Sequence, residues 1–127
     1  MAKGTDTMED TRTEQIEALE IMADFNTKLL KNLPIIIKEL SGERLDDTDK
    51  FLNSIVDAIN WEIQVVNRTM EVLNEGKERV NKENFNGAIV ELSKAINSKD
   101  DGKMAAEFKK VIPVFEKLGE SVKEVIK

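Results

Sequence analysis

The sequence predicts an all-α protein, folded as an antiparallel four-helix bundle whose first and last helices are kinked by proline. Apolar residues recur at spacings of three and four along most of the chain, which is the pattern of helices that bury one face. No segment alternates apolar and polar residues for long enough to indicate a strand. Short polar stretches separate four helical segments, and 127 residues fit a single domain, so the helices are expected to share one core.

The first helix is expected to begin near Thr11. Residues 1–10 show no apolar periodicity and are predicted to be a disordered tail, which leaves residues 11–127 as a single helical-bundle domain. Thr11 and Glu14 have the spacing of a capping box, and the pair Ser41-Gly42 ends the helix. The apolar positions between these signals are Ile16, Leu19, Met22, Ala23, Leu29, Leu30, Leu33, Ile36, Ile37 and Leu40.

The second helix is expected to start after Asp46 or Asp47, because their carboxylates can accept hydrogen bonds from the first free N–H groups. It should run to about Asn74, with Gly76 as the stop. Its main apolar positions are Phe51, Leu52, Ile55, Val56, Ile59, Ile63, Val66, Met70 and Leu73.

The third helix is expected over residues 82–97 and the fourth over residues 103–126, joined by the polar turn 98–102. Asn81 or Asn84 can cap the third helix. The connection 75–81 is either a loop or a continuation of the second helix.

Pro34 and Pro113 lie inside the first and fourth helices. Each lacks an N–H donor, so each is expected to kink its helix. Such kinks can open space between helices, which supports an alternative function: a sensor or carrier for an apolar small molecule. The side chains expected to line that space are Ile36, Met104, Phe108 and Phe115.

Histidine, cysteine and tyrosine are absent from the chain. Their absence excludes a histidine phosphotransfer bundle, a Glu-x-x-His di-iron site and a Ser-His-Asp hydrolase, so no catalytic residue, cofactor or metal is expected. The acidic clusters 46–49 and 100–101 are interpreted as helix caps, because neither has the spacing of a calcium loop. A carboxylate-only hydrolase needs at least two acids inside the core, and Glu62, at the flank of an apolar stripe, is the only nearby candidate.

The net charge of −6 and the lack of a basic stripe argue against nucleic acid or anionic membrane as a partner. The residues from Met1 to Asp10 do not resemble an export signal, and together with the absence of cysteine this predicts a cytoplasmic protein.

Five asparagines, Asn53, Asn60, Asn67, Asn74 and Asn81, recur every seven residues. On a straight helix this repeat drifts by only about 20° per step, so the first four form a row along the second helix. The row is either a solvated, uncharged face or a polar seam against another helix or subunit, where amides fix the register.

A partner surface is predicted around Trp61, the only tryptophan. Trp61, Val65 and Val72 share a second apolar side of the second helix, and Ile21 and Phe25 lie off the main stripe of the first. They either pack against neighbouring helices or form a surface that binds a protein partner or a second copy in a homodimer. Asn26, within the apolar stripe of the first helix, is either a buried amide with partners or a wet residue at the end of the bundle.

The segment Ala95-Ile-Asn-Ser-Lys-Asp100, followed by Ala105 to Glu116 with Pro113 near its end, resembles a pattern in small uncharacterised helical proteins of Gram-positive bacteria. The segment Ile59-Asn-Trp61 is compatible with the same group, whereas Lys109 and Lys110 depart from it. The resemblance implies an all-helical domain of unknown function and assigns no catalytic residue. We therefore expect a non-enzymatic protein–protein interaction domain that acts as a homodimer, adaptor or chaperone-like partner.

Overall fold

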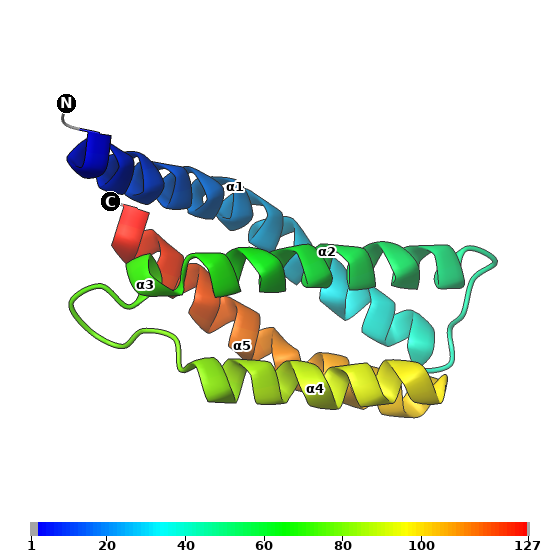
Figure 1. Ribbon diagram of the computed structural model, residues 1–127. Helices are drawn as coiled ribbons and strands as arrows, with labels where there is room; N and C mark the ends of the chain where they lie inside the picture. Colours follow the sequence, from blue (N-terminus) through cyan, green and yellow to red (C-terminus); the bar gives the residue numbers. More distant parts are fainter. Residues whose placement is uncertain (1–2, 127) are drawn as a thin grey trace.

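The computed structural model describes the backbone of residues 3–126 and the side chains of residues 11–126. It is all-helical, and no strand occurs within residues 3–126. The prediction of an all-α protein is therefore confirmed. The helices are α1 (Lys3–Leu40), α2 (Thr48–Arg68), α3 (Met70–Leu73), α4 (Lys82–Ser98) and α5 (Asp101–Ile126) (Figure 1).

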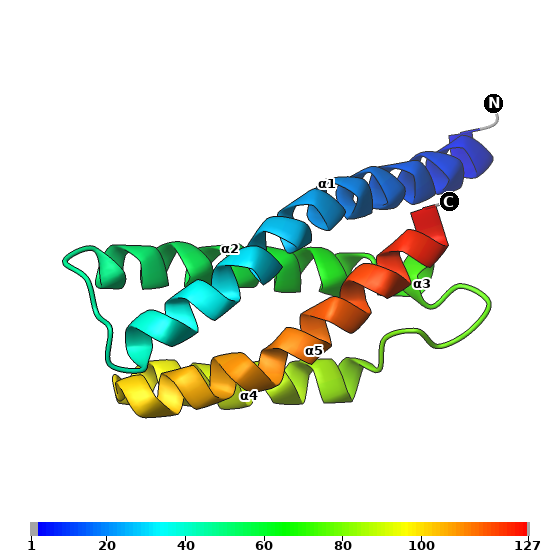
Figure 2. The same cartoon turned by 180° about the vertical axis from the view of Figure 1, so that it is seen from behind.

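The four long helices form two layers. Helices α2 and α4 run side by side in one layer, and α1 and α5 run obliquely behind them, as both views show (Figures 1 and 2). Helix α1 packs against both α2 and α5, and α5 packs against α4. Each layer therefore has one face on the core and one face turned outward.

Helix α1 begins at Lys3, which corrects the expected start near Thr11. The capping-box pair Thr11 and Glu14 lies inside the helix, where the backbone N–H groups already have partners in the preceding turn. The predicted boundary between residues 10 and 11 thus falls within α1, while Met1 and Ala2 lie outside the described residues. As predicted, α1 ends just before Ser41, and Gly42 adopts a φ of +113°, which favours glycine.

The start of α2 is close to the predicted position, but its capping is different. Asp47 occupies the cap position without a side-chain hydrogen bond. Thr48 Oγ1 instead accepts a hydrogen bond from the Leu45 N–H at 2.7 Å and donates one to the Glu39 carboxylate at 2.7 Å. Thr48 and Glu39 are both buried, so this pair fixes the α1–α2 connection from inside.

The expected single helix to Asn74 is interrupted at Thr69, which is a second correction. The Thr69 hydroxyl donates to the Val65 carbonyl at 2.6 Å, and its own N–H is shared between the carbonyls of Val65 and Val66. A threonine side chain that competes for backbone carbonyls in this way disturbs the regular helix. After the single turn α3, the chain continues as a loop, and Gly76 has a φ of +84°.

Helices α4 and α5 follow the expected pattern with small shifts. Asn81 caps α4 by accepting a hydrogen bond from the Asn84 N–H at 2.9 Å, as predicted. Helix α5 begins at Asp101 rather than at Lys103, and Asp100 Oδ1 accepts a hydrogen bond from the Lys103 N–H at 3.0 Å. Helices α1 and α5 both continue past their prolines.

The core is one continuous apolar cluster drawn from every helix. It contains the apolar positions predicted for the first and second helices, which confirms that their periodicity marks buried faces. It also contains apolar residues at spacings of three and four in α4 and α5, such as Phe85, Leu92, Phe108 and Phe115. The side chains that are less than 2 % exposed include Leu19, Met22, Leu33, Leu73, Leu92, Phe108, Phe115 and Leu118.

A buried amide joins α1 to α5 in the middle of this core. Asn26 is 2 % exposed, and its Nδ2 donates a hydrogen bond to the Phe115 carbonyl at 2.9 Å. Gly119 lies one turn after Phe115, and a Cβ placed there would come within 2.9 Å of Asn26 Nδ2. The glycine therefore leaves the carbonyl accessible to the amide. The alternative of a wet residue at the end of the bundle is wrong for Asn26.

We expect the substitution Gly119→Ala to destabilise the fold by about 1–3 kcal/mol, because the added methyl group displaces Asn26 from the Phe115 carbonyl. Gly87→Ala in α4 is the matched control, since nothing lies within 4 Å of a Cβ at that position. There alanine should stabilise by about 0.5–1 kcal/mol through helix propensity. Urea unfolding followed by circular dichroism measures both. A gain of stability in Gly119→Ala would contradict the role given to this glycine.

Candidate interaction surface

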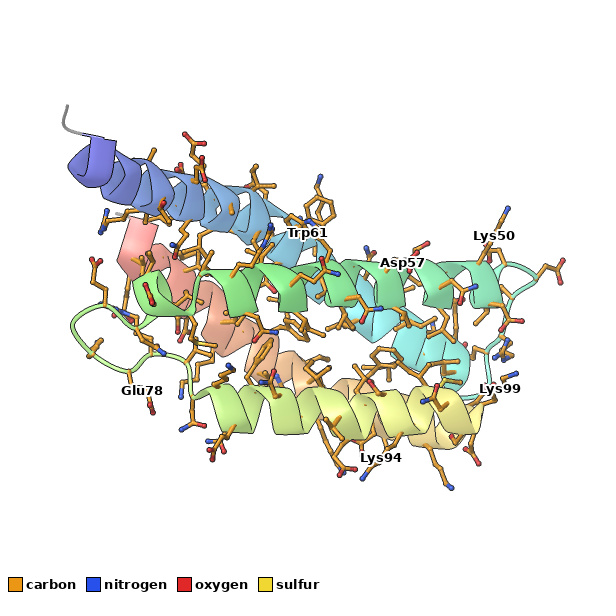
Figure 3. The ribbon with its side chains drawn as sticks, in the orientation of Figure 1. Lys50, Asp57, Trp61, Glu78, Lys94 and Lys99 are labelled. Atoms are coloured by element: carbon orange, nitrogen blue, oxygen red, sulfur yellow. The ribbon has the colours of Figure 1, made fainter. Side chains whose placement is uncertain are left out.

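Three of the predicted partner-binding residues meet on the surface at the edge between α1 and α2. The rings of Phe25 and Trp61 lie 4.8 Å apart between centroids and are tilted by 43°. Ile21 lies one helical turn before Phe25, and the two side chains are 55 % and 44 % exposed. Trp61 is half-buried and lies on the edge of α2 that faces α1 (Figure 3). We call these three side chains the Ile21–Phe25–Trp61 surface.

Val65 and Val72, which were predicted to belong to the same surface, lie in the core. Val65 is 0 % and Val72 4 % exposed. Val65, one turn after Trp61 on α2, is turned toward the interior, and Val72 lies in α3, beyond the break at Thr69. The neighbouring helices cover both side chains. For these two valines the correct alternative is internal packing, and we remove them from the predicted surface.

Polar and charged side chains surround the three apolar ones. Asp24 and Lys28 on α1 and Asp57 and Gln64 on α2 are exposed and lie within one turn of Phe25 or Trp61 in sequence. Other exposed apolar side chains, such as Leu45 and Val90, belong to other parts of the chain. An apolar centre with a polar rim of both charges is the usual composition of a small protein-binding surface.

Glu62 lies on the inner side of α2, next to Trp61 in sequence. It is 0 % exposed, and neither carboxyl oxygen has a hydrogen-bond partner among the described residues. Burial raises the pKa of Glu62 to about 8, so the carboxyl group is mostly neutral at pH 7. The sequence placed Glu62 only at the flank of the apolar stripe and did not reveal that it would be enclosed.

Asn26 and Glu62 directly follow Phe25 and Trp61 in sequence, and both side chains are buried. The rings of Phe25 and Trp61 are in contact. Asn26 Oδ1, like the Glu62 carboxyl oxygens, lacks a hydrogen-bond partner among the described residues. The exposed aromatic pair is thus backed by two buried polar side chains.

The predicted ligand space between kinked helices is filled. Ile36, Met104, Phe108 and Phe115 are each at most 3 % exposed and belong to the packed core. The surface hollows lie elsewhere. One of about 130 Å³ lies between the loop before α4 and α5, where it is lined by Val80, Phe85 and Leu118 among others.

The acidic clusters interpreted as helix caps make specific contacts. Arg44 binds Asp101 through Nε at 2.6 Å and Nη2 at 2.9 Å, and Asp49 through Nη1 at 2.8 Å. Arg44 holds the pKa of the Asp101 carboxyl below its usual value. Within residues 11–126 we find no group of three acidic side chains arranged to hold a metal ion. Among the helices described, none has a stretch long and apolar enough to cross a membrane.

We expect the free energy of unfolding to fall by roughly 3 kcal/mol between about pH 5 and pH 8 because of Glu62. Its pKa rises from 4.5 to about 8 on folding, so the folded state binds an extra proton in this range and loses stability as the pH rises. Glu62→Gln stays neutral, so it should flatten this profile and raise stability at pH 8. Urea titrations at several pH values measure the effect.

The matched control for this experiment is Asp57→Asn, which removes the same charge from an exposed position on α2. It should leave the slope of stability against pH close to that of the wild type. An unchanged slope in Glu62→Gln would show that Glu62 is not protonated on folding.

Comparison with known proteins gives one match. A family model described as Domain of unknown function (DUF8042) matches residues 16–121. No curated protein and no solved structure matches the chain. The matched region contains the Ile21–Phe25–Trp61 surface and the buried Asn26 and Glu62. Since the match covers most of the sequence, and in agreement with the resemblance to an uncharacterised helical domain, the chain belongs to the family described as Domain of unknown function (DUF8042).

Proposed function

We propose that this domain is a non-enzymatic interaction module that binds another protein through the Ile21–Phe25–Trp61 surface. In this proposal the four long helices act as a four-helix bundle, bent at Pro34 and Pro113, that holds the surface rigid. The role is that of an adaptor or chaperone-like partner.

The observation that carries the proposal is the contact between Phe25 and Trp61 at a solvent-facing helix edge, with Ile21 exposed beside it. Aromatic side chains that are held in place and partly exposed supply most of the binding energy in many protein interfaces. The indole and phenyl rings already touch in the free protein, so little side-chain entropy is lost when a partner covers them.

Binding rather than catalysis is supported by the chemistry of the acidic residues. The chain has no histidine, cysteine or tyrosine, so carboxyl groups and lysines are the remaining side chains for general acid–base chemistry. Glu39 and Glu62 are the acidic residues buried within residues 11–126. Glu39 contacts Thr48 at the start of α2, and Glu62 lies 14 residues further along the same helix, about 21 Å away. This separation is too large for the two acids to act on one bond.

The alternative, a sensor or carrier of an apolar small molecule, has weaker support. The four side chains expected to line its site fill the core. Four hollows on the surface of the described residues have volumes from about 130 to about 290 Å³, below the roughly 300–1,000 Å³ of usual ligand pockets. We therefore favour a protein partner.

We expect Trp61→Ala and Phe25→Ala each to weaken binding of the partner about thirtyfold or more, because each removes a central anchor. Affinity capture from an extract of the native host, followed by mass spectrometry, identifies proteins that the wild type retains and both variants lose. The affinity is then measured by titration, with Trp61 fluorescence reporting burial of the indole in the wild type.

Val90→Ala on α4 is the control, because it truncates a side chain that is 51 % exposed in another part of the fold. It should retain the partner. A folded Trp61→Ala protein that binds as tightly as the wild type would overturn the proposed surface.

A further inference from the structure

The outer face of the α2/α4 layer carries a groove with an apolar floor and a polar rim. Its floor is formed by Ile59 and Leu92, which are 2 % and 1 % exposed, and its walls by the half-buried Val56, Ile89 and Ile96. The groove has a volume of about 210 Å³, below the roughly 300–1,000 Å³ of small-molecule pockets, so it suits inserted side chains better than a separate ligand.

The rim of this groove is polar but uncharged. Asn60 borders it on α2, and Ser93 and Asn97 border it on α4. No charged side chain is among the described residues that line the groove, and Asp57 above α2 and Lys94 below α4 lie on the outer edges of the layer (Figure 3). In a chain with 35 % charged residues, a face bordered only by amides and a hydroxyl is a distinct chemical environment.

One member of the seven-residue asparagine row, Asn60, lies on this rim. Asn53, Asn60 and Asn67 are exposed on α2, with Asn60 in the middle. The last two asparagines of the row form hydrogen bonds within the chain. Asn74 binds the backbone of Arg79 and Val80, and Asn81 caps α4. Intramolecular contacts therefore explain only the last two asparagines.

We infer that the α2/α4 face binds the same face of a second copy of the chain, with the asparagine rows of the two copies paired across a two-fold axis. In a two-fold symmetric dimer the same surface of each copy forms the interface, so this surface must be complementary to itself. An amide both donates and accepts hydrogen bonds and can pair with its own kind, whereas two copies of a chain with net charge −6 repel elsewhere. In an antiparallel pairing of two α2 helices, Asn60 faces Asn60, and Asn53 faces Asn67.

The size of the face fits this occupant. Helix α4 has 17 residues and is therefore about 25 Å long, and two adjacent helices are about 20 Å wide. The footprint is on the order of 500 Å² on each copy, so pairing would bury about 1,000 Å² in total, which reaches the lower bound of a biological interface. Pairing would cover the remaining exposed area of Val56, Ile89 and Ile96. Buried amides at such positions set register and oligomeric state.

The test is the mass of the full chain in solution, measured by size-exclusion chromatography with light scattering from micromolar to millimolar concentration. The wild type should form a dimer. Asn60→Asp and Asn60→Lys should each raise the dissociation constant about tenfold or more, because two like charges meet at the axis. An equimolar mixture of the two variants should recover a dimer, since opposite charges then face each other.

Ser54→Asp is the matched control, because it adds the same charge as Asn60→Asp at an exposed site on α2 that does not line the groove and lies about 120° around the helix from Asn60. It should leave the dissociation constant unchanged, as should Trp61→Ala. Circular dichroism establishes that every variant is folded.

A wild type that stays monomeric throughout the concentration range would overturn the inference. A dimer that Asn60→Asp leaves intact, or that Ser54→Asp weakens equally, would do the same. Loss of the dimer in Trp61→Ala would show that the chain associates through the Ile21–Phe25–Trp61 surface and not through the α2/α4 face. The proposed partner of that surface would then be a second copy of the chain. If Trp61→Ala loses the protein partner but still forms a dimer, the inferred α2/α4 dimer interface is supported.

Discussion

The close approach of α1 and α5 through Asn26 and Gly119 is the constraint on which the arrangement of the helices depends. The amide of Asn26 reaches a backbone carbonyl of α5 only because the residue one turn later has no side chain. This directional contact fixes the rotation of α1 about its axis. Apolar packing alone is less selective, because many rotations bury similar area.

The rotation of α1 decides which of its side chains remain outside. With Asn26 directed at α5, Phe25 is turned toward the outer edge of the α1–α2 contact and meets Trp61 there. Ile21, one turn earlier, is exposed beside it. The buried polar contact and the exposed aromatic contact are therefore two results of one orientation.

Glu62 makes the same region energetically unusual. A carboxyl group without a partner is costly to bury, and it remains in the core because it takes up a proton. Ionisation of Glu62 at high pH therefore lowers the stability of the core on the inner side of α2. Trp61, which contacts Phe25 at the surface, is the residue next to Glu62 on this helix.

Most of the fold could be predicted from the sequence, because helix periodicity and turn residues are local signals. The four apolar stripes, the Asn81 cap and the stops at Gly42 and Gly76 follow from spacing and residue type. The break at Thr69 was missed because a threonine fits a helix as readily as it interrupts one. The sequence could not show that Trp61 stays partly exposed while Val65 is buried. Both residues lie on the same side of α2, and the difference depends on where α1 crosses that side.

The three consecutive residues Asn60, Trp61 and Glu62 explain why α2 does not show one simple stripe. Successive side chains on a helix diverge by about 100°, so these three point in three different directions. One borders the uncharged groove, the next joins Phe25 at the α1 edge, and the third enters the core. A helix that serves only one core needs one apolar face and tolerates charge elsewhere. Helix α2 instead keeps its charged side chains off the groove and places a tryptophan at an exposed edge, and this distribution is the physical reason for assigning two separate binding surfaces to one helix.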